Sequence, residues 1–234
     1  MSVFVTTHTD VGAGNVLSCT EGIRSFFEEH SFWPRDVEQV LLNGKVQKIK
    51  ILSEGSTEPV QVSVAGKYTG VFKEDSGAHF EVAAYLIDRL LGLNLIPPTV
   101  MRRVNGKLGS LQFFVEGGQN PYVTGGAPSQ EMKMLDYLIG NTDRTGKNYL
   151  VLPGGRQVAI DHGLAFRVGF SRLPIWNVQQ SLPRPEVFSR LVALEDLTIT
   201  NELKGLLSQE AIRNLIARKN YFVTEALKLV RANP

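Results

Sequence analysis

The chain has 234 residues, of which 43% are hydrophobic and 21% charged, a composition ordinary for one large globular domain or two small lobes around a cleft. Its 25 Lys and Arg residues against 23 Asp and Glu residues give a net charge of +2, which argues against a dedicated nucleic-acid binder with a concentrated basic face. The single cysteine, Cys19, excludes an internal disulfide, and no Cys/His cluster has the spacing of a zinc site.

The N-terminal residues have none of the usual targeting signals. No apolar run approaches the roughly 20 residues of a membrane span. Residues 1–19 lack the basic start and continuous apolar core of a secretory signal. We therefore expect no membrane span and a cytoplasmic location; an exported effector acting in a host cytosol is the alternative, since the start is rich in Ser and Thr. Residues 1–36 are predicted to be an N-terminal arm with a short helix from Thr20.

Residues 37–73 have the pattern of β-strands. The sequence predicts strands over 37–42, 46–52, 60–64 and 68–73. Asn43-Gly44, the segment 53–57 and the segment 65–67 are the predicted turns. We expect an antiparallel sheet of three or more strands.

The middle of the chain alternates between helix and hairpin. An apolar stripe predicts a helix over 79–92, with Gly92 as its C-terminal cap. Strands over 99–104 and 110–116 flank the turn Asn105-Gly106. Residues 117–128 form a glycine-rich connector, so we expect an N-lobe over 37–118 and a C-lobe over 119–234.

The C-terminal part is predicted to be mostly helical. One apolar face predicts a helix over 131–139. Residues 167–200 contain three prolines and are expected to form loops and short helical turns. Residues 201–231 are predicted to be helical, with Ser208 able to cap the last helix.

The stretch from Asn141 to Phe166 carries the residues most suggestive of chemistry. It reads as a loop, a strand, a tight turn and a second strand that ends on Asp161. Phosphoryl transfer from ATP uses an Asp that positions or deprotonates a hydroxyl, and an Asn and a second Asp that hold magnesium. Asp143, Asn148 and Asp161 supply these groups. Asp143 and Asn148 could also be ordinary turn formers, whereas a charged residue ending an apolar strand is costly unless paired or metal-bound.

Three upstream features would complete a nucleotide site. Lys73 ends a predicted strand, and Glu81 lies in the first turn of the next helix. A strand lysine fixed by a helical glutamate is how kinases grip phosphates, although both could be solvated surface charges. The turn at 53–57, which contains Ser56, could cover the phosphates with backbone N–H groups or be a plain hairpin loop.

The order of these features is more specific than any one of them. It is carried by the segments GVFKED, EVAAYLIDRLLGLNLIPPTV, GSLQFFVEG, LDYLIGNTDRTGKNYLV and AIDHGLAF. Together, over roughly residues 45–166, they resemble the phosphatidylinositol 3/4-kinase-like branch of the protein-kinase-like superfamily. That branch includes lipid kinases, secretory casein-type kinases, actin-fragmin kinase, HipA-type toxin kinases and small bacterial effector kinases.

The resemblance implies an α+β, bilobal protein-kinase-like fold, in which an N-terminal antiparallel sheet lobe with one main helix joins a mostly helical C-terminal lobe. ATP and magnesium, or manganese, are the implied cofactors. By the same resemblance Lys73 grips the phosphates and Glu81 is its partner. Asp143 is the implied catalytic-loop aspartate, and Asn148 and Asp161 are the implied metal ligands.

The resemblance also implies the adenine contacts, and the chain departs from the family pattern at two points. Backbone groups of a hinge strand are expected to meet adenine, and the cofactor-binding residues it implies there are Gln112, Phe113, Phe114 and Val115. Ser56, in the turn that could cover the phosphates, is the other expected cofactor-binding residue, but this turn is poorer in glycine than the phosphate loop of a protein kinase. Many members have His directly after the Asp-Arg pair, where this chain has Thr145.

These features favour a magnesium-dependent kinase whose acceptor is a protein Ser or Thr. The sequence shows no Lys/Arg cluster suited to an inositol phosphate head group. The alternatives are a phosphoinositide kinase, AMP transfer on the same fold, or a non-catalytic pseudokinase that binds partners. Residues 171–190 could form an acceptor platform, although packing is the preferred role for Trp176. His162 is expected to be structural, and Asp136 to be solvated or capping.

Overall fold

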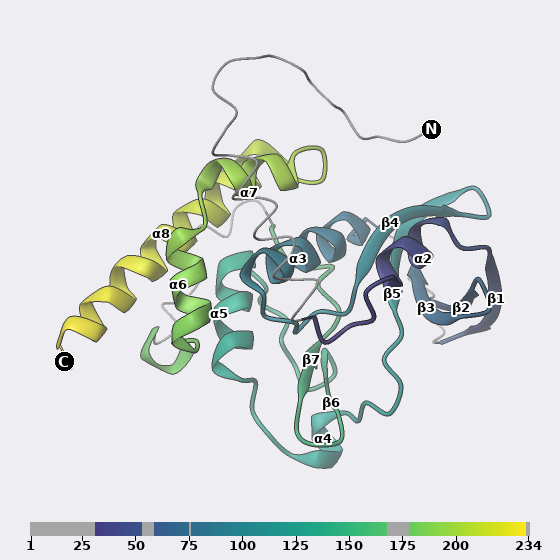
Figure 1. Cartoon of the computed structure of the whole chain (residues 1–234), viewed down its shortest axis with the longest axis horizontal. Helices are drawn as coiled ribbons and strands as arrows, with labels where there is room; N and C mark the ends of the chain where they lie inside the picture. The colour runs from purple at the N-terminus through teal and green to yellow at the C-terminus, as the bar shows by residue number, and fades with distance from the viewer. Residues whose placement is uncertain (1–30, 53–58, 75, 168–177, 233–234) are drawn as a thin grey trace.

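The computed structural model describes residues 31–52, 59–74, 76–167 and 178–232. An antiparallel sheet with two helices against it is built from the N-terminal half, and most of the other helices come from the C-terminal half (Figure 1). This is the α+β arrangement that the sequence predicts. The predicted N-terminal helix from Thr20, the turn containing Ser56 and the residue Trp176 lie outside the described residues.

The sheet has five strands in the order β1-β2-β3-β5-β4, with every neighbouring pair antiparallel. The strands are β1 (Val46–Ile51), β2 (Val60–Val64), β3 (Tyr68–Lys73), β4 (Thr99–Val104) and β5 (Lys107–Phe113). The predicted turns after β2 and β4 are confirmed, since Gly66 and Gly106 both have the positive φ that a tight turn of this kind needs.

The predicted strand over 37–42 is wrong, because these residues form helix α2 (Val37–Asn43). Val37 and Leu41, four residues apart, are buried together in the apolar cluster of the sheet, and this burial overrides the β-propensity of the valines. Gly44 therefore ends a helix and does not turn a hairpin. A Cβ on Gly44 would lie 2.6 Å from the Val40 carbonyl oxygen and 2.7 Å from a Val64 methyl group.

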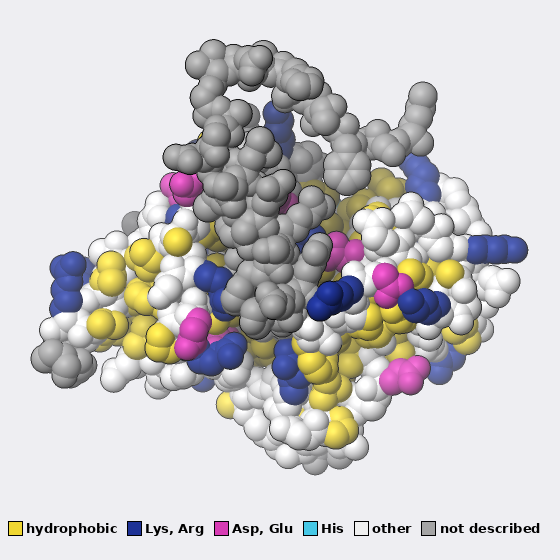
Figure 2. Space-filling model, viewed as in Figure 1, with side chains coloured by type: hydrophobic (Ala, Val, Ile, Leu, Met, Phe, Trp, Pro, Cys, Tyr) yellow, Lys and Arg dark blue, Asp and Glu magenta, His cyan; other side chains and the backbone are white. Residues whose placement is uncertain are grey.

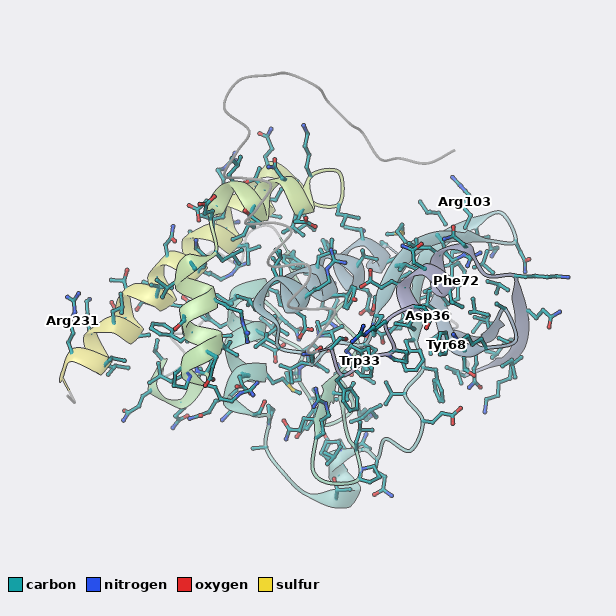
Figure 3. The ribbon with its side chains drawn as sticks, in the orientation of Figure 1. Trp33, Asp36, Tyr68, Phe72, Arg103 and Arg231 are labelled. Carbon is teal, nitrogen blue, oxygen red and sulfur yellow. The ribbon has the colours of Figure 1, made fainter. Side chains whose placement is uncertain are left out.

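Polar side chains fasten α2 to the sheet. The hydroxyl of Tyr68, the first residue of β3, donates at 2.7 Å to Asp36, the residue directly before α2. Trp33 and Phe72 belong to the same apolar cluster (Figure 3). Paired residues of an antiparallel sheet share a face, so Phe72 and Leu111 face this cluster, while the next residue along β3, Lys73, faces away from it.

The remaining helices build a second apolar cluster. Helix α3 (Ala78–Leu91) ends at Gly92 in the left-handed conformation, as predicted. The elements that follow β5 are α4 (Pro121–Thr124), α5 (Gln130–Ile139), β6 (Tyr149–Val151), β7 (Gln157–Ala159), the 3-10 helix η1 (Val178–Ser181), α6 (Pro185–Ala193), α7 (Asp196–Leu203) and α8 (Gln209–Ala232). Helices α3, α5, α6, α7 and α8 all contribute side chains to this cluster.

One prediction about the C-terminal part needs correction. The expected loop region 167–200 includes the nine-residue helix α6, which Pro185 begins, because proline fits the first turn of a helix. The helical region predicted over 201–231 contains the end of α7 and most of α8, which are separated where Gly205 has a φ of 88°. Ser208 accepts a hydrogen bond from the Ala211 N–H at 3.2 Å, so the predicted cap of the last helix is confirmed. None of the helices in the described ranges has the length and hydrophobicity that a membrane span requires.

The segment after α3 is held by a buried carboxylate. Asp88, 2% exposed, accepts from the Leu95 N–H at 2.9 Å. The Leu95 carbonyl in turn accepts from Ala159 of β7 at 2.9 Å. Burial raises the pKa of Asp88 to about 7, although backbone N–H groups of Leu95 and Ile96 favour its charged form. This carboxylate therefore links the C-terminal end of α3 to the strand that leads into Asp161.

The Asp88 carboxyl should make folding stability fall as the pH rises from about 4 through neutrality, because its pKa is raised to about 7 in the folded state. Near pH 6 the folded state retains a proton that the unfolded state has lost, so the free energy of unfolding falls with rising pH until the folded carboxyl has also ionised. From pH 6 to pH 8 this group should remove about 1.4 kcal/mol from the free energy of unfolding. Asp88→Asn should reduce that loss in urea unfolding at the two pH values. An unchanged pH dependence in the variant would contradict the assignment.

Gly109 permits the close contact between β5 and β3. A Cβ there would lie 2.3 Å from the Lys73 carbonyl oxygen and 2.8 Å from the Phe72 ring. Gly109→Ala should therefore lower the free energy of unfolding by about 1–3 kcal/mol, as overpacking does. Denaturant unfolding measures this loss. The neighbouring Leu108 is 51% exposed, so Leu108→Ala is the matched control and should stay within about 0.5 kcal/mol of the parent.

Candidate active site

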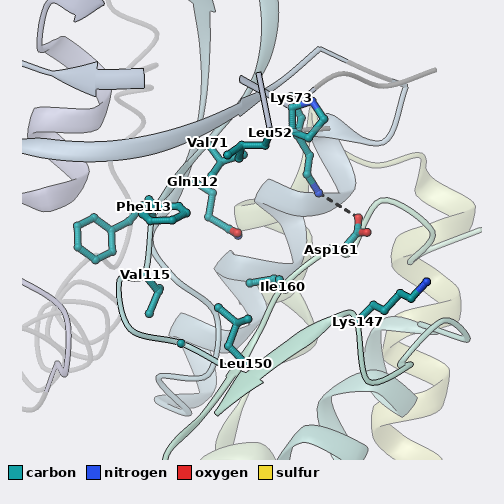
Figure 4. A pocket seen from close by; sticks show the side chains of 13 residues that line it. Leu52, Val71, Lys73, Gln112, Phe113, Val115, Lys147, Leu150, Ile160 and Asp161 are labelled. Atoms are coloured by element: carbon teal, nitrogen blue, oxygen red, sulfur yellow. Dashed lines mark hydrogen bonds and ion pairs between the residues drawn. The ribbon is translucent and has the colours of Figure 1, made fainter. Parts of the chain in front are cut away.

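A cleft of about 350 Å³ lies where β3, β5, the segment after β5 and the β6–β7 hairpin meet. Its lining divides into two kinds of side chain. Lys73, Lys147 and Asp161 lie on one side of the cleft, and Phe113 and Val115 lie on the other (Figure 4). Apolar side chains also line it, namely Leu52, Val71, Leu150 and Ile160. A ligand with an apolar flat part and a charged part matches this division.

Lys73 reaches the cleft from the end of β3 and is held by two carboxylates. Its ammonium group lies 2.8 Å from Glu81 Oε1 and 3.0 Å from Asp161 Oδ1. Burial by itself would lower the pKa of Lys73, but the charges of Glu81 and Asp161 raise it above its ordinary value. The ammonium is thus a fixed positive charge, and the predicted pairing of Lys73 with Glu81 is confirmed.

Glu81, in the first turn of α3, has both carboxylate oxygens engaged. Oε1 accepts from Lys73, and Oε2 accepts from the backbone N–H of His162 at 3.0 Å. Burial would raise the pKa of Glu81, but the hydrogen bonding of His162 and the charge of Lys73 lower it to about 2. One ionised carboxylate therefore joins the sheet, helix α3 and the segment after β7.

Asp161 follows β7 in a backbone conformation that few side chains adopt. Its φ is 60°, in the left-handed region, which is uncommon for an aspartate and costs free energy. The side chain is 52% exposed and lines the cleft, whereas the next residue, His162, is fully buried. The unusual φ thus separates a carboxylate that faces the cleft from a side chain that faces the core.

The loop before β6 brings Asp143 and Asn148 together. The Asn148 side-chain N–H donates to the Asp143 carbonyl at 2.7 Å and to Asp143 Oδ2 at 3.0 Å. This leaves the amide oxygen of Asn148 and the second carboxylate oxygen of Asp143 as acceptors. Within the described residues no three His, Cys, Asp or Glu side chains gather in a metal-binding group. The candidate ligands Asn148 and Asp161 would both offer oxygen atoms, which Mg²⁺ prefers. Two protein ligands suit Mg²⁺, because this ion usually keeps several water molecules in its coordination shell.

A buried ion pair that the sequence analysis missed supports this loop. Arg144 lies beside Asp136 of α5, with 2.9 Å from Nη2 to Oδ1 and 2.9 Å from Nε to Oδ2. Asp136 is 3% exposed, so the expectation of a solvated residue is wrong. The available signal was its position among apolar neighbours on α5, since a carboxylate is buried there only when it is paired.

Arg144 also fixes the strands around the site and the state of His162. It donates to the carbonyls of Asn148 and of Ile160, the latter at 2.9 Å. Its Nη2 lies 2.8 Å from His162 Nε2. Because an arginine can only donate, Nε2 accepts, and the ring proton is on Nδ1, 3.5 Å from Glu81 Oε2. Burial lowers the pKa of His162, so the ring is neutral and fits the structural role expected for it.

The predicted hinge residues line the cleft from β5 and the segment after it. Gln112, Phe113, Phe114 and Val115 are all lining residues. The N–H of Phe113 donates to the Pro98 carbonyl at 2.8 Å, and that of Phe114 donates to the Thr69 carbonyl at 2.9 Å. These two N–H groups are therefore engaged within the sheet, and Val115 is the next residue whose backbone can meet a ligand.

Comparisons with known proteins show what the chain as a whole is similar to. The family model described as phosphatidylinositol 3- and 4-kinase matches residues 59–234. The crystal structure of the Golgi casein kinase with Mn/ADP bound has a TM-score of 0.61 at 16% identity, covering 93% of this chain and 84% of that chain. The Helicobacter pylori proinflammatory kinase CtkA has a TM-score of 0.53 at 12% identity, covering 81% of this chain and 98% of that chain. No curated protein matches the sequence.

Breaking the buried ion pair should destabilise the protein strongly. Asp136→Asn leaves the Arg144 guanidinium buried without a counter-charge, so the free energy of unfolding should fall by about 3–5 kcal/mol. The control is Glu131→Gln on the same helix, because its partner Arg184 is 63% exposed and such pairs contribute less than about 1 kcal/mol. Urea unfolding of the two variants and the parent measures the difference. Equal losses in both variants would contradict a special role for Asp136.

Proposed function

Because this chain belongs to the phosphatidylinositol 3- and 4-kinase family and is a kinase, we propose that it transfers the γ-phosphate of ATP, with magnesium, to the hydroxyl of a protein Ser or Thr. One observation carries the proposal: Lys73 is held by Glu81 and by Asp161 at the charged side of an otherwise apolar cleft. A fixed lysine beside an exposed carboxylate is the arrangement that phosphoryl transfer requires.

The two sides of the cleft would bind different parts of the nucleotide. Adenine would lie among the apolar side chains, between Val71 above and Leu150 and Ile160 below, with Val115 offering backbone groups at its edge. The triphosphate would extend toward Lys73, which would bind the α- and β-phosphates. Since Lys73 is already positioned by Glu81, little ordering remains to be done when ATP binds.

Asp143 would act on the acceptor. The acceptor hydroxyl attacks the γ-phosphorus, the bond from that phosphorus to the oxygen bridging it to ADP breaks, and the hydroxyl proton passes to Asp143. Asn148 and Asp161 would hold the metal through oxygen atoms, and the metal would neutralise phosphate charge. The hydrogen bonds from Asn148 to the Asp143 carbonyl and Oδ2 hold the Asp143 carboxylate in one orientation before substrates arrive.

The proposal of a protein acceptor rests on the distribution of basic side chains over the surface. Basic side chains on the face shown in Figure 2 are scattered among acidic and apolar ones, with no cluster matched to an inositol phosphate. The solved Golgi casein kinase carries Mn/ADP, which supports a nucleotide and a divalent metal here and allows manganese in place of magnesium. The family description favours phosphoinositides as a second candidate acceptor.

Labelled ATP tests the proposal. Purified protein is incubated with magnesium and ATP labelled in the γ-position or the α-position, with a cell lysate or with phosphoinositide vesicles as acceptor. We expect γ-label in lysate proteins, reduced by about 10²-fold or more in Asp143→Asn and Asp161→Asn. Glu186→Gln, in the first turn of α6, is the control and should match the parent.

Each other result selects a different function. Transfer of the α-label identifies AMP transfer, and label in lipid alone identifies a phosphoinositide kinase. Equal γ-labelling by the parent and both aspartate variants contradicts catalysis by this site. If magnesium-ATP raises the melting temperature of neither the parent nor Asp161→Asn, and no label is transferred, the protein is a non-catalytic binding module.

A further inference from the structure

Lys147 is a second lysine that lines the cleft, and the sequence analysis gave it no role. It comes from the loop between Asp143 and β6, whereas Lys73 comes from the sheet. We propose that Lys147 binds the γ-phosphate of ATP and stabilises the negative charge on that group during transfer. This inference rests on the proposed function and assigns one further catalytic residue to it.

The backbone around Lys147 is held in place by its neighbours. Its N–H donates to Thr145 Oγ1 at 3.3 Å. The following residue, Asn148, is 7% exposed, and its N–H donates to the Thr145 carbonyl at 3.0 Å. Arg144 donates to the Asn148 carbonyl from the buried ion pair. The loop is therefore fixed on both sides of Lys147, and the fold sets the position of the Lys147 backbone at the edge of the cleft.

The charges of the two lysines are compensated differently. Lys73 is paired with Glu81 and Asp161, which neutralise it in the absence of ligand. Lys147 is exposed and forms no ion pair with any carboxylate in the described part of the chain. A lysine is cationic at neutral pH. The cleft thus presents one positive charge without a protein partner, and a triphosphate supplies the matching negative charge.

The position of Lys147 along the loop suits the γ-phosphate better than the inner phosphates. Lys147 is four residues after Asp143, which would meet the acceptor hydroxyl, and directly before Asn148. The γ-phosphoryl group lies between the acceptor oxygen and the departing ADP, so it is the phosphate nearest this loop. Charge spreads over its three outer oxygens while the old bond breaks and the new one forms, and a cation beside these oxygens lowers the free energy of that state.

An acidic acceptor is the other negative group that Lys147 could contact. The two roles differ in which ligand binds differently when Lys147 is substituted. Loss of a γ-phosphate contact weakens ATP binding but leaves ADP binding unaffected, and it slows the hydrolysis of ATP by water when no acceptor is present. Loss of an acceptor contact changes the KM for the acceptor and leaves the affinities for ATP and ADP unaltered.

The test compares the affinities for ATP and ADP, measured by titration calorimetry with magnesium, in the parent and in Lys147→Met. We expect ATP binding to weaken about tenfold and ADP binding to stay within about twofold. The rate of acceptor-free ATP hydrolysis should fall about a hundredfold, with partial recovery in Lys147→Arg. Lys73→Met should weaken both nucleotides, and the exposed Lys204→Met, placed after α7, should change nothing.

The outcomes separate this inference from the proposed function. If the parent binds and hydrolyses ATP and Lys147→Met does so equally well, the γ-phosphate role is wrong while the kinase proposal stands. Equal weakening of ATP and ADP, or a change confined to the acceptor KM, also overturns it. A parent protein that binds neither nucleotide removes the proposed function, and the inference is overturned with it.

Discussion

The arrangement of the site depends on one buried carboxylate, that of Glu81. Its two oxygens accept from Lys73 and from the backbone N–H of His162. These partners belong to the sheet and to the segment after β7, while Glu81 itself belongs to α3, so three parts of the chain meet at a single charged group. An unpaired buried carboxylate is strongly unfavourable. The three parts must therefore come together for any of them to be stable in this position, and the lysine is placed as a consequence.

The Arg144–Asp136 pair has the corresponding role on the other side of the cleft. A buried ion pair adds little net stability, because the loss of hydration offsets the attraction between the charges. Its value here is geometric: the same guanidinium reaches the carbonyls of Asn148 and Ile160, which flank the two strands of the β6–β7 hairpin. The loop that carries Asp143 and Asn148 and the strand that delivers Asp161 are thus positioned by one residue. The cleft can then have exposed charged groups at its surface because buried, satisfied groups hold the backbone beneath them.

The local patterns predicted much of this correctly, and their failures have physical causes. Helix α3, the Asn105-Gly106 hairpin and the strand that ends at Lys73 follow from periodicity and turn chemistry, which act within a few residues. Residues 37–42 were predicted as a strand because their valines favour β-structure, but Val37 and Leu41 are four apart and bury together against the sheet. The burial of Val37 and Leu41 depends on a surface formed by residues far along the chain.

The sequence by itself determined the identity and order of the polar residues, from Lys73 and Glu81 to Asp143, Asn148 and Asp161, and this order was enough to indicate a kinase. Only the tertiary structure decided which of these groups touch. Contacts such as Lys73 to Asp161 join residues 88 positions apart, and the φ of 60° at Asp161 that directs its carboxylate to the cleft has no local sequence signal. Likewise, Asp136 could not be recognised as buried, or Lys147 as part of the cleft, until distant segments had packed together. Such placements are set by burial and pairing across the fold, which short-range patterns do not record.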